Sequence, residues 1–305
     1  MNSTKRARAL ALLLLPAALL GMTACSNPDA GKGSEKSDSA PAEALPEAEM
    51  STEANELIPD EIRSKGKIVA AMDTGAPPMH YVEAGSDDVV GLDADLAVAL
   101  GQALGVEVVV QPTTFDGIIP GIAADKFDLS IAQMSPTAER MEVLDFVTYA
   151  QAGDALGVAA GNPEDLSIDS LCGHKVGALK GSWQQLEVVP GLDEACAAAG
   201  EPALDVSTYP DMQGPVLALQ ANRIEAFLID GPAGNYAANE SDQLEVAEEV
   251  NVGIVGIGSK KGNGLDAAVQ AALESLKEQG VYEAAFEHWG LSANMVDEFT
   301  INVEA

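Results

Sequence analysis

A turn between a strand and a helix carries the first residues whose types and spacing could bind a ligand. In the stretch from Asp128 to Arg140, DLSIAQMSPTAER, an apolar strand ends in a polar turn that contains Gln133 and Ser135. Thr137 is predicted to cap a helix that includes Arg140. A strand that ends where a helix begins leaves backbone N–H groups free for an anion, and a guanidinium adds a paired donor that fits a carboxylate. The stretch on its own also fits an arginine that is a solvated charge on a helix.

The elements that must position this turn alternate along the chain. Apolar and β-branched runs predict strands at 67–72, 106–111, 128–131, 155–159, 175–179, 204–208, 226–229 and 252–257. Helical spacing predicts helices at 95–104, 115–124, 137–144, 192–199, 212–221, 231–238, 265–279 and 281–289, with another after Gly181-Ser182. Such alternation is typical of an α/β protein with a largely parallel sheet. The passages near 151–159 and 250–257 are rich in strand formers and could join two lobes.

The N-terminus resembles a targeting signal. Lys5, Arg6 and Arg8 form a basic region, and the apolar residues 9–20 are too few to predict a membrane span. Small residues then precede Cys25, as in the cleavage site of a bacterial lipoprotein. We therefore expect a signal peptide at 1–24, and a Cys25 whose fatty acyl chains, such as palmitate, anchor an extracytoplasmic protein to the cell membrane. An ordinary secretory signal with an incidental Cys25 is the alternative.

A polar segment at 25–57 separates this signal from the folded part of the chain. It is rich in Ser, Ala, Pro, Glu and Asp and contains no aromatic residue. Such a composition buries too little apolar surface to fold, so the segment is predicted to be a flexible linker. The folded domain is expected to begin near Ile58.

The charge balance excludes one class of partner. The chain has 16 Lys and Arg residues against 48 Asp and Glu residues, a net charge of −32. Loss of the basic signal region would make the charge more negative. Binding to phosphates requires a basic surface, so no nucleic-acid partner is expected.

Cysteine usage agrees with export. With Cys25 lipidated, Cys172 and Cys196 remain as an even pair, which indicates a disulfide in an exported chain. Two buried free thiols are the alternative. The 3 histidines are scattered without the spacing of zinc ligands, so neither a metal nor another cofactor is expected.

Several segments, in a fixed order, narrow the choice of family. They are Ile68–Tyr81 (IVAAMDTGAPPMHY), Gly91–Leu96 (GLDADL), Phe115–Pro120 (FDGIIP), Lys126–Arg140, Val176–Ser182 (VGALKGS) and Ile224–Asp230 (IEAFLID). In this order they resemble family 3 of the extracellular solute-binding proteins, which serve polar amino-acid ABC importers. The resemblance covers residues 60 to 290.

This resemblance implies an α/β, two-lobed periplasmic-binding-protein-like (type II) fold with a hinge between the lobes. Lobe 1 would hold residues 58–154 and 255–305, and lobe 2 would hold 155–254. It also implies a monomer that captures an amino acid or a related small zwitterion between the lobes. The protein would deliver this ligand to an ABC permease in the membrane.

The resemblance implies roles for individual residues as well. Arg140 would bind the ligand's carboxylate and Asp230 its ammonium group, although Asp230 could also be a plain helix cap. Phe115 would form an apolar wall or, alternatively, part of the core. Asp93 is expected at the cleft edge and Asp95 as a helix cap. The predicted ligand-binding residues are Arg140, Asp230, Ser135, Gln133, Phe115, Ser182, Trp183, Met79 and Asp73.

Departures from the family pattern concern the ligand's side chain. Ala76 stands where the family often has a stacking aromatic, and Met79 where it usually has phenylalanine. Trp183 replaces a small hydroxyl residue, so the aromatic could have moved to the other lobe. Gln133 replaces a glycine or serine. The carboxylate partner is therefore easier to predict than the side chain that is recognised.

Two other classes of function are alternatives to this one. The same architecture occurs in periplasmic dehydratases, but the sequence has no nucleophile elbow, phosphate loop or metal spacing. We therefore expect a protein that is not an enzyme. A ligand-sensing subunit would need a separate partner to signal.

Overall fold

The described part of the chain begins inside the predicted linker. The computed structural model describes residues 45–305, so the signal peptide at 1–24, Cys25 and most of the linker lie outside the described residues. The predicted end of the linker at residue 57 is wrong, because α1 (Thr52–Glu56) is a helix whose Ala54 is fully buried. The side chain of Ser51 caps this helix by accepting a hydrogen bond from the Ala54 N–H. Among residues 45–305, no helix is both long and apolar enough to cross a membrane.

One mixed sheet of 8 strands organises the fold, in the order β5-β1-β6-β11-β7-β10-β8-β9. Its strands are β1 (Lys67–Met72), β5 (Glu107–Pro112), β6 (Leu129–Met134), β7 (Leu144–Ala159), β8 (Lys175–Leu179), β9 (Asp205–Tyr209), β10 (Ala226–Asp230) and β11 (Leu244–Lys260). β1 is parallel to β5 and β6, and β8 is parallel to β9 and β10. The predicted α/β class is confirmed.

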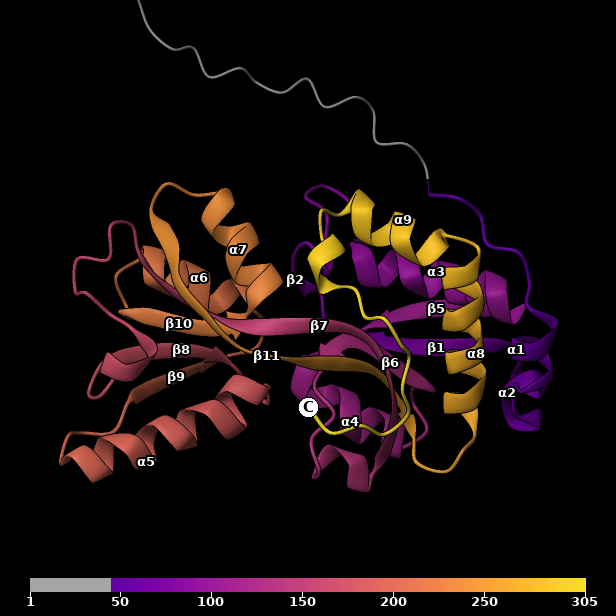
Figure 1. Cartoon of the computed structure of the whole chain (residues 1–305), viewed down its shortest axis with the longest axis horizontal. Helices are drawn as coiled ribbons and strands as arrows, with labels where there is room; N and C mark the ends of the chain where they lie inside the picture. The colour runs from indigo at the N-terminus through magenta and orange to yellow at the C-terminus, as the bar shows by residue number, and fades with distance from the viewer. Residues whose placement is uncertain (1–44) are drawn as a thin grey trace, which may run out of the picture. The chain divides into compact units, whose positions relative to one another are not determined.

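The strands β7 and β11 join the two parallel groups (Figure 1). β7 has 16 residues and β11 has 17, and they pair in antiparallel fashion along nearly their whole lengths. The short strands predicted at 155–159 and 252–257 therefore cover only parts of them. One reason is that 144–150 is buried throughout, so it lacks the polar–apolar alternation that would mark a strand. We call the elements around β1, β5 and β6 lobe 1 and those around β8, β9 and β10 lobe 2.

Helices cover the strands of each lobe (Figure 1). Lobe 1 has α2 (Asp60–Lys65), α3 (Leu92–Leu104), α4 (Phe115–Ala123), α8 (Leu265–Glu278) and α9 (Val281–His288), besides α1. Lobe 2 has α5 (Val189–Ala199), α6 (Gln213–Gln220) and α7 (Gly231–Asn239). A small second sheet of β2 (Gly75–Ala76), β3 (His80–Val82) and β4 (Val89–Val90) precedes α3.

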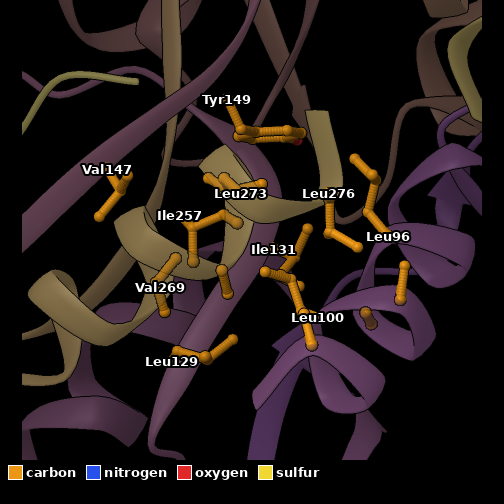
Figure 2. Packing of buried hydrophobic residues seen from close by; sticks show 14 of the residues in the cluster. Leu96, Leu100, Leu129, Ile131, Val147, Tyr149, Ile257, Val269, Leu273 and Leu276 are labelled. Carbon is orange, nitrogen blue, oxygen red and sulfur yellow. The ribbon is translucent and has the colours of Figure 1, made fainter. Parts of the chain in front are cut away.

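The core of lobe 1 fills the space between the sheet and α3 and α8. Figure 2 shows side chains of β6, β7 and β11 facing those of the two helices. The labelled residues are Leu96, Leu100, Leu129, Ile131, Val147, Tyr149, Ile257, Val269, Leu273 and Leu276. Burial of each such side chain stabilises the fold by about 1.5–3 kcal/mol. This core gives the carboxyl ends of β1 and β6 a rigid support.

Two predicted helices differ from the structure. The helix expected at 137–144 is only a 3₁₀ turn, Arg140–Glu142, because the chain from Leu144 onward pairs with β11 instead. The helix expected after Gly181-Ser182 begins as a π-helical turn, Gln184–Val188, and continues directly into α5.

Lobe 2 contains the predicted disulfide. Cys172 and Cys196 are bonded, with their Cα atoms 5.5 Å apart. The bond ties α5 to the loop before β8, and Cys196 belongs to the buried cluster of this lobe. The prediction of this disulfide is confirmed, and the alternative of free thiols is wrong.

Candidate functional site

Arg140 lies between the lobes and is buried. Its side chain donates from Nη1 to the carbonyl of Ser135 (2.8 Å) and from Nη2 to the carbonyl of Gly181 in lobe 2 (2.9 Å). The residue is only 6% exposed, which excludes a solvated charge on a helix. Its guanidinium carbon lies 5.6 Å from the centre of the Phe115 ring. Burial lowers the pKa of Arg140 to about 10, with Asp230 opposing the shift, so the guanidinium remains charged at neutral pH.

The strand end before Arg140 carries the polar residues noted in the sequence, and the structure buries it. Gln133 has a positive φ of 47° and is 3% exposed. Its backbone N–H donates to the Tyr149 hydroxyl (3.3 Å), whereas its side-chain amide has no hydrogen-bond partner among residues 45–305. Ser135 contributes its carbonyl to Arg140, and Thr137 accepts from the Arg140 N–H through its hydroxyl (3.2 Å). Thr137 therefore caps a single turn rather than a helix.

Asp230 stands at the end of β10, directly before α7. Its side chain makes no capping hydrogen bond to α7, so the plain helix cap is not what the structure contains. Instead, its Oδ1 accepts from the Gln184 amide (2.7 Å). Burial raises the pKa of Asp230 to about 7; the bond from Gln184 opposes this shift, while Asp154 and Asp73 add to it. The carboxylate of Asp230 is therefore poorly solvated and lies near two other carboxylates, those of Asp154 and Asp73.

Gln184 links Asp230 to a second acid that sequence reasoning missed. The same amide nitrogen donates to Asp154 Oδ1 (2.7 Å), while the amide oxygen has no hydrogen-bond partner in the described chain. Asp154 is 3% exposed and also accepts from Asn251 (2.9 Å). A charged residue directly before the apolar run 155–159 was the available signal, because buried acids are rare unless they are paired.

Asp73, at the end of β1, belongs to a buried chain of polar groups. His80 is fully buried, with Nε2 at 3.0 Å from Asp73 Oδ1 and Nδ1 at 2.7 Å from Asp93 Oδ2. The contact with Asp73 lacks the direction of a hydrogen bond, so both Asp73 oxygens have no hydrogen-bond partner within 45–305. The Tyr149 hydroxyl donates to Asp93 Oδ1 (2.7 Å) and accepts from Gln133, which completes the chain. Burial opposes a charge on His80, but the two carboxylates outweigh it and raise its pKa to about 10.

The expectations for Asp93 and Asp95 are wrong. Asp93 is fully buried in the network with His80, not at a cleft edge. Asp95 lies inside α3, which begins earlier, at Leu92, and its Oδ2 accepts from the Trp289 indole (2.7 Å). The helix can start there because Gly91 has a φ of 122°, which a residue with a side chain rarely adopts.

The other predicted ligand-binding residues surround this centre to different extents. Phe115 is buried at the start of α4, in a cluster that includes Met212 and other residues of lobe 2. The Ser182 hydroxyl accepts a hydrogen bond from the backbone N–H of Gln185 (3.2 Å). The backbone N–H of Ser182 donates to the Leu179 carbonyl. Met79 is 1% exposed and belongs to the core of lobe 1. Met79 is therefore placed in the core, without a contact that marks it as a ligand residue.

Two hollows between the lobes meet at Trp183. One has a volume of about 360 Å³ and is lined by Phe115 and Arg140 from lobe 1 and by Gly181 and Trp183 from lobe 2. The other, of about 570 Å³, is lined by Ser135, Asp154, Trp183 and Asp230 among others. Trp183 and Glu187 line both hollows, so they border the region near the guanidinium as well as the region near the acids.

Several of the buried polar atoms without hydrogen-bond partners in the described chain lie at strand ends. They include atoms of Asp73, which follows β1, of Gln133, near the end of β6, and of Gln184, which follows β8. His80, Ser130, Ser259 and Glu283 contribute the others. Ligands of open α/β sheets bind outside the carboxyl ends of the strands. A buried polar group without a partner costs about 1–3 kcal/mol. Because several such groups lie at these strand ends, they could be satisfied by a small polar ligand.

A comparison with known families identifies the chain. Residues 68–292 match the bacterial extracellular solute-binding proteins, family 3. The chain belongs to this family. The match begins at Ile68, where the first of the similar sequence segments begins, and spans both lobes.

Individual family members are similar over most of their length. The arginine-binding protein ArgT of Corynebacterium glutamicum is 23% identical over 248 residues, which cover 81% of this chain and 81% of that protein. The lysine/arginine/ornithine-binding periplasmic protein of Escherichia coli is 30% identical over 223 residues, 69% of this chain and 82% of that protein.

Solved structures share the two-lobed fold. An ancestral arginine-binding protein bound to arginine superposes with a TM-score of 0.66 at 30% identity, over 73% of this chain and 98% of that one. The ancestral amino acid-binding protein AncCDT-1, a precursor of cyclohexadienyl dehydratase, gives a TM-score of 0.65 at 28% identity, over 75% and 98% of the two chains. The predicted two-lobed type II fold is confirmed.

Proposed function

We propose that this family 3 protein captures a free amino acid between its lobes and delivers it to the permease of an ABC importer. The observation that carries the proposal is the combination of a buried cation and a partly buried acid from different lobes. Arg140 comes from lobe 1 and Asp230 from lobe 2, and the charge of Asp230 opposes the lowering of the Arg140 pKa by burial. This arrangement suits a zwitterion.

The chemistry of the two half-sites supports this assignment. The Arg140 guanidinium is bonded to main-chain carbonyls, which are neutral acceptors that a ligand carboxylate could replace or join. Hydrogen bonds to charged groups contribute about 1.5–3 kcal/mol each. Asp230 would accept from the ligand's ammonium group. Because only approached lobes present both groups together, the ligand would favour the closed arrangement.

Relatives narrow the ligand class without fixing it. Family members with arginine, with lysine, arginine and ornithine, and with L-cystine in their names all resemble this chain. In this proposal Asp73, Gln133 and Trp183 recognise the ligand's side chain, together with Phe115 and Ser182. The unpartnered amide of Gln133 and carboxylate of Asp73 favour a polar side chain.

The cellular setting is part of the proposal. We infer an extracytoplasmic monomer that the acylated Cys25 anchors to the cell membrane. The basic, apolar and cysteine-containing start of the sequence supports this inference. The lobes would divide near residues 154 and 255, and the register shift of β11 between Val250 and Gly253 supports a hinge at this place.

Binding without catalysis is the proposal, although one relative is a precursor of a dehydratase. A general acid or base must be able to exchange a proton with the substrate. His80 lies between Asp73 and Asp93. Burial lowers its pKa, but the two carboxylates outweigh this effect and raise the pKa above its ordinary value. A histidine that stays charged in this way is a poor base, which favours a purely binding role.

The test is a binding screen followed by one substitution. Isothermal titration calorimetry with each of the standard L-amino acids is expected to find at least one ligand. Arg140→Ala should then weaken binding of the tightest ligand by about 100-fold, because about 3 kcal/mol of charged hydrogen bonding is lost.

Arg223→Ala is the matched control, since Arg223 is exposed in lobe 2. It should leave the affinity unchanged, and circular dichroism should show that both variants fold. Equal affinities of the Arg140→Ala variant and the unchanged protein would contradict the role of Arg140. Absence of binding by every amino acid would contradict the proposed function itself.

A further inference from the structure

A buried acid and a partly buried acid face each other across neighbouring strands beside the proposed ammonium half-site. Asp154 of β7 and Asp230 of β10 are opposite residues of an antiparallel pair. The amide nitrogen of Gln184 lies 2.7 Å from an oxygen of each. Like charges directly opposite each other in a sheet are destabilising, and burial increases the effect because water no longer screens them.

The partners of this acid pair are neutral amides. Gln184 bridges the two carboxylates, and Asn251 donates to the other oxygen of Asp154 (2.9 Å). Neither amide supplies a positive charge. The geometry therefore leaves two adjacent carboxylates without a directly bonded cation in the described chain.

The charged groups farther out do not change this balance. Asp73 and Glu249 are acids that act on Asp230 and on Asp154, respectively, and His80 is the cation that acts on Asp230 but is already held by two carboxylates. Arg140 bonds to carbonyls. Burial is the main cause that raises the pKa of both Asp154 and Asp230, and for Asp230 the value reaches about 7. Two carboxylates that share a site characteristically hold one proton between them.

We propose that Asp154 is the second acid of the ammonium half-site, and that the ligand's ammonium group displaces a proton which Asp154 and Asp230 share. The inference rests on the proposed function and adds to it a specificity-determining residue and a proton. The ammonium group is already positively charged, so it takes up no proton on binding. Its charge replaces that of the shared proton, which is released to solvent. The amide oxygen of Gln184, which is buried without a hydrogen-bond partner in the described chain, would accept a hydrogen bond from the ammonium group.

Asp154 also lies where the lobes are connected. In β7 it is opposite Val250 of β11, just before the register shift between Val250 and Gly253. Its partner Asn251 occupies that shift, with a positive φ of 53°. A group that binds the ammonium would thus be fixed to the hinge rather than to the tip of a lobe.

The sign of the pH dependence follows from the shared proton. Ligand binds the deprotonated pair, so affinity is highest above the pKa of Asp230, about 7, and falls as the pH drops below it. The loss is about tenfold for each pH unit below that point. Proton release should be seen as a dependence of the calorimetric enthalpy on the ionisation enthalpy of the buffer.

The test compares pH profiles of affinity between pH 5 and 9 for L-arginine, or for whichever standard amino acid binds tightest in the screen. Asp154→Asn keeps the shape of the side chain but removes its charge. It should move the midpoint of the profile to lower pH by about one unit, and it should reduce the proton release at pH 7. A merely structural role of Asp154 would lower affinity at every pH without moving the midpoint.

Asp145→Asn is the matched control. Asp145 is a buried acid of the same strand that also accepts from an asparagine amide, that of Asn302 (2.9 Å), but it contacts neither Gln184 nor Asp230. Its profile should match that of the unchanged protein. An unmoved midpoint in the Asp154→Asn variant would overturn the inference.

A second measurement needs neither a variant nor a ligand. Carbon-13 NMR of the aspartate carboxyl groups of the full ligand-free protein should show two that titrate together near pH 7. If Asp154 and Asp230 both titrate below pH 5, the inference fails even though an amino acid binds. If no standard amino acid binds while the pair titrates near pH 7, the proposed function fails and the shared proton stands.

Discussion

At the scale of single residues, the site depends on buried charges that hold one another in place. His80 is fully buried, and its two ring nitrogens face Asp73 and Asp93 at 3.0 and 2.7 Å. Asp93 is fixed in turn by Tyr149. Since breaking a buried ion pair leaves an uncompensated charge, the partners of His80 depend on it strongly. The same network positions the Gln133 backbone at the proposed ligand site, through its N–H bond to Tyr149.

Replacement of His80 by leucine tests this network. His80→Leu should lower the free energy of unfolding by about 3–5 kcal/mol, because two carboxylates lose their buried cation. His174→Leu is the control, since His174 pairs with Glu225 at the surface, where such a pair contributes about 0–1 kcal/mol. Urea denaturation of both variants measures the difference. Equal losses for the two variants would show that the buried network contributes little.

The same network predicts how stability changes with pH. The carboxylates raise the pKa of His80 to about 10, above the value near 6.5 of an unfolded histidine. A raised pKa stabilises the folded state fully below about pH 6.5, and this contribution is lost as the pH rises through 10. Urea denaturation at pH 8 and pH 10 should show the loss, and the His80→Leu variant should not share it.

At the scale of elements, two long strands and one disulfide decide how lobe 2 is held. β7 and β11 connect it to lobe 1, and the bond between Cys172 and Cys196 closes a loop with a sequence separation of 24 residues around β8 and the start of α5. The apolar cluster around α5 and β8 in lobe 2 is also smaller than the core of lobe 1. A covalent link therefore matters more here than it would in lobe 1.

Removal of the disulfide should destabilise the protein without affecting ligand binding. The Cys172→Ser, Cys196→Ser double variant should lose on the order of 3 kcal/mol of unfolding free energy, because a closed loop of this length restricts the unfolded chain. Chemical denaturation measures the loss, and reduction of the unchanged protein should reproduce it. An unchanged denaturation midpoint would mean that the bond does not contribute to stability.

At the scale of the molecule, contacts between the lobes differ in strength. Tyr236 of α7 lies 6.4 Å from Tyr81 of lobe 1, centre to centre, and Tyr81 packs edge-on against Trp289 at 6.3 Å. Lys180 of lobe 2 pairs with Asp116 of lobe 1 at 2.8 Å, but the lysine side chain is 62% exposed. Aromatic pairs contribute about 0.5–1.5 kcal/mol beyond their buried area, whereas exposed ion pairs contribute less.

These contacts should tune ligand affinity through lobe closure. Tyr236→Ala should weaken the tightest standard amino acid by about two- to tenfold, although Tyr236 does not line the proposed ligand site. Small-angle scattering of the ligand-free variant should show a larger radius of gyration. Lys180→Ala is the comparison and should change both quantities less. An effect of Lys180→Ala as large as that of Tyr236→Ala would contradict this ranking.

The sequence by itself determined the class of fold, the family and part of the site. Its alternating strands and helices, the disulfide, Arg140 in the turn after β6 and Asp230 at the end of β10 are encoded in short runs of residues, which local patterns can reveal. The tertiary structure decided the length of β7 and β11 and the fate of Asp93, Asp95 and the helix expected after Thr137. It alone joined Asp154, Gln184 and Asp230. These features depend on pairing between segments 30 to 97 residues apart, as for Gln184 and Asn251 with Asp154, and no local pattern contains that information.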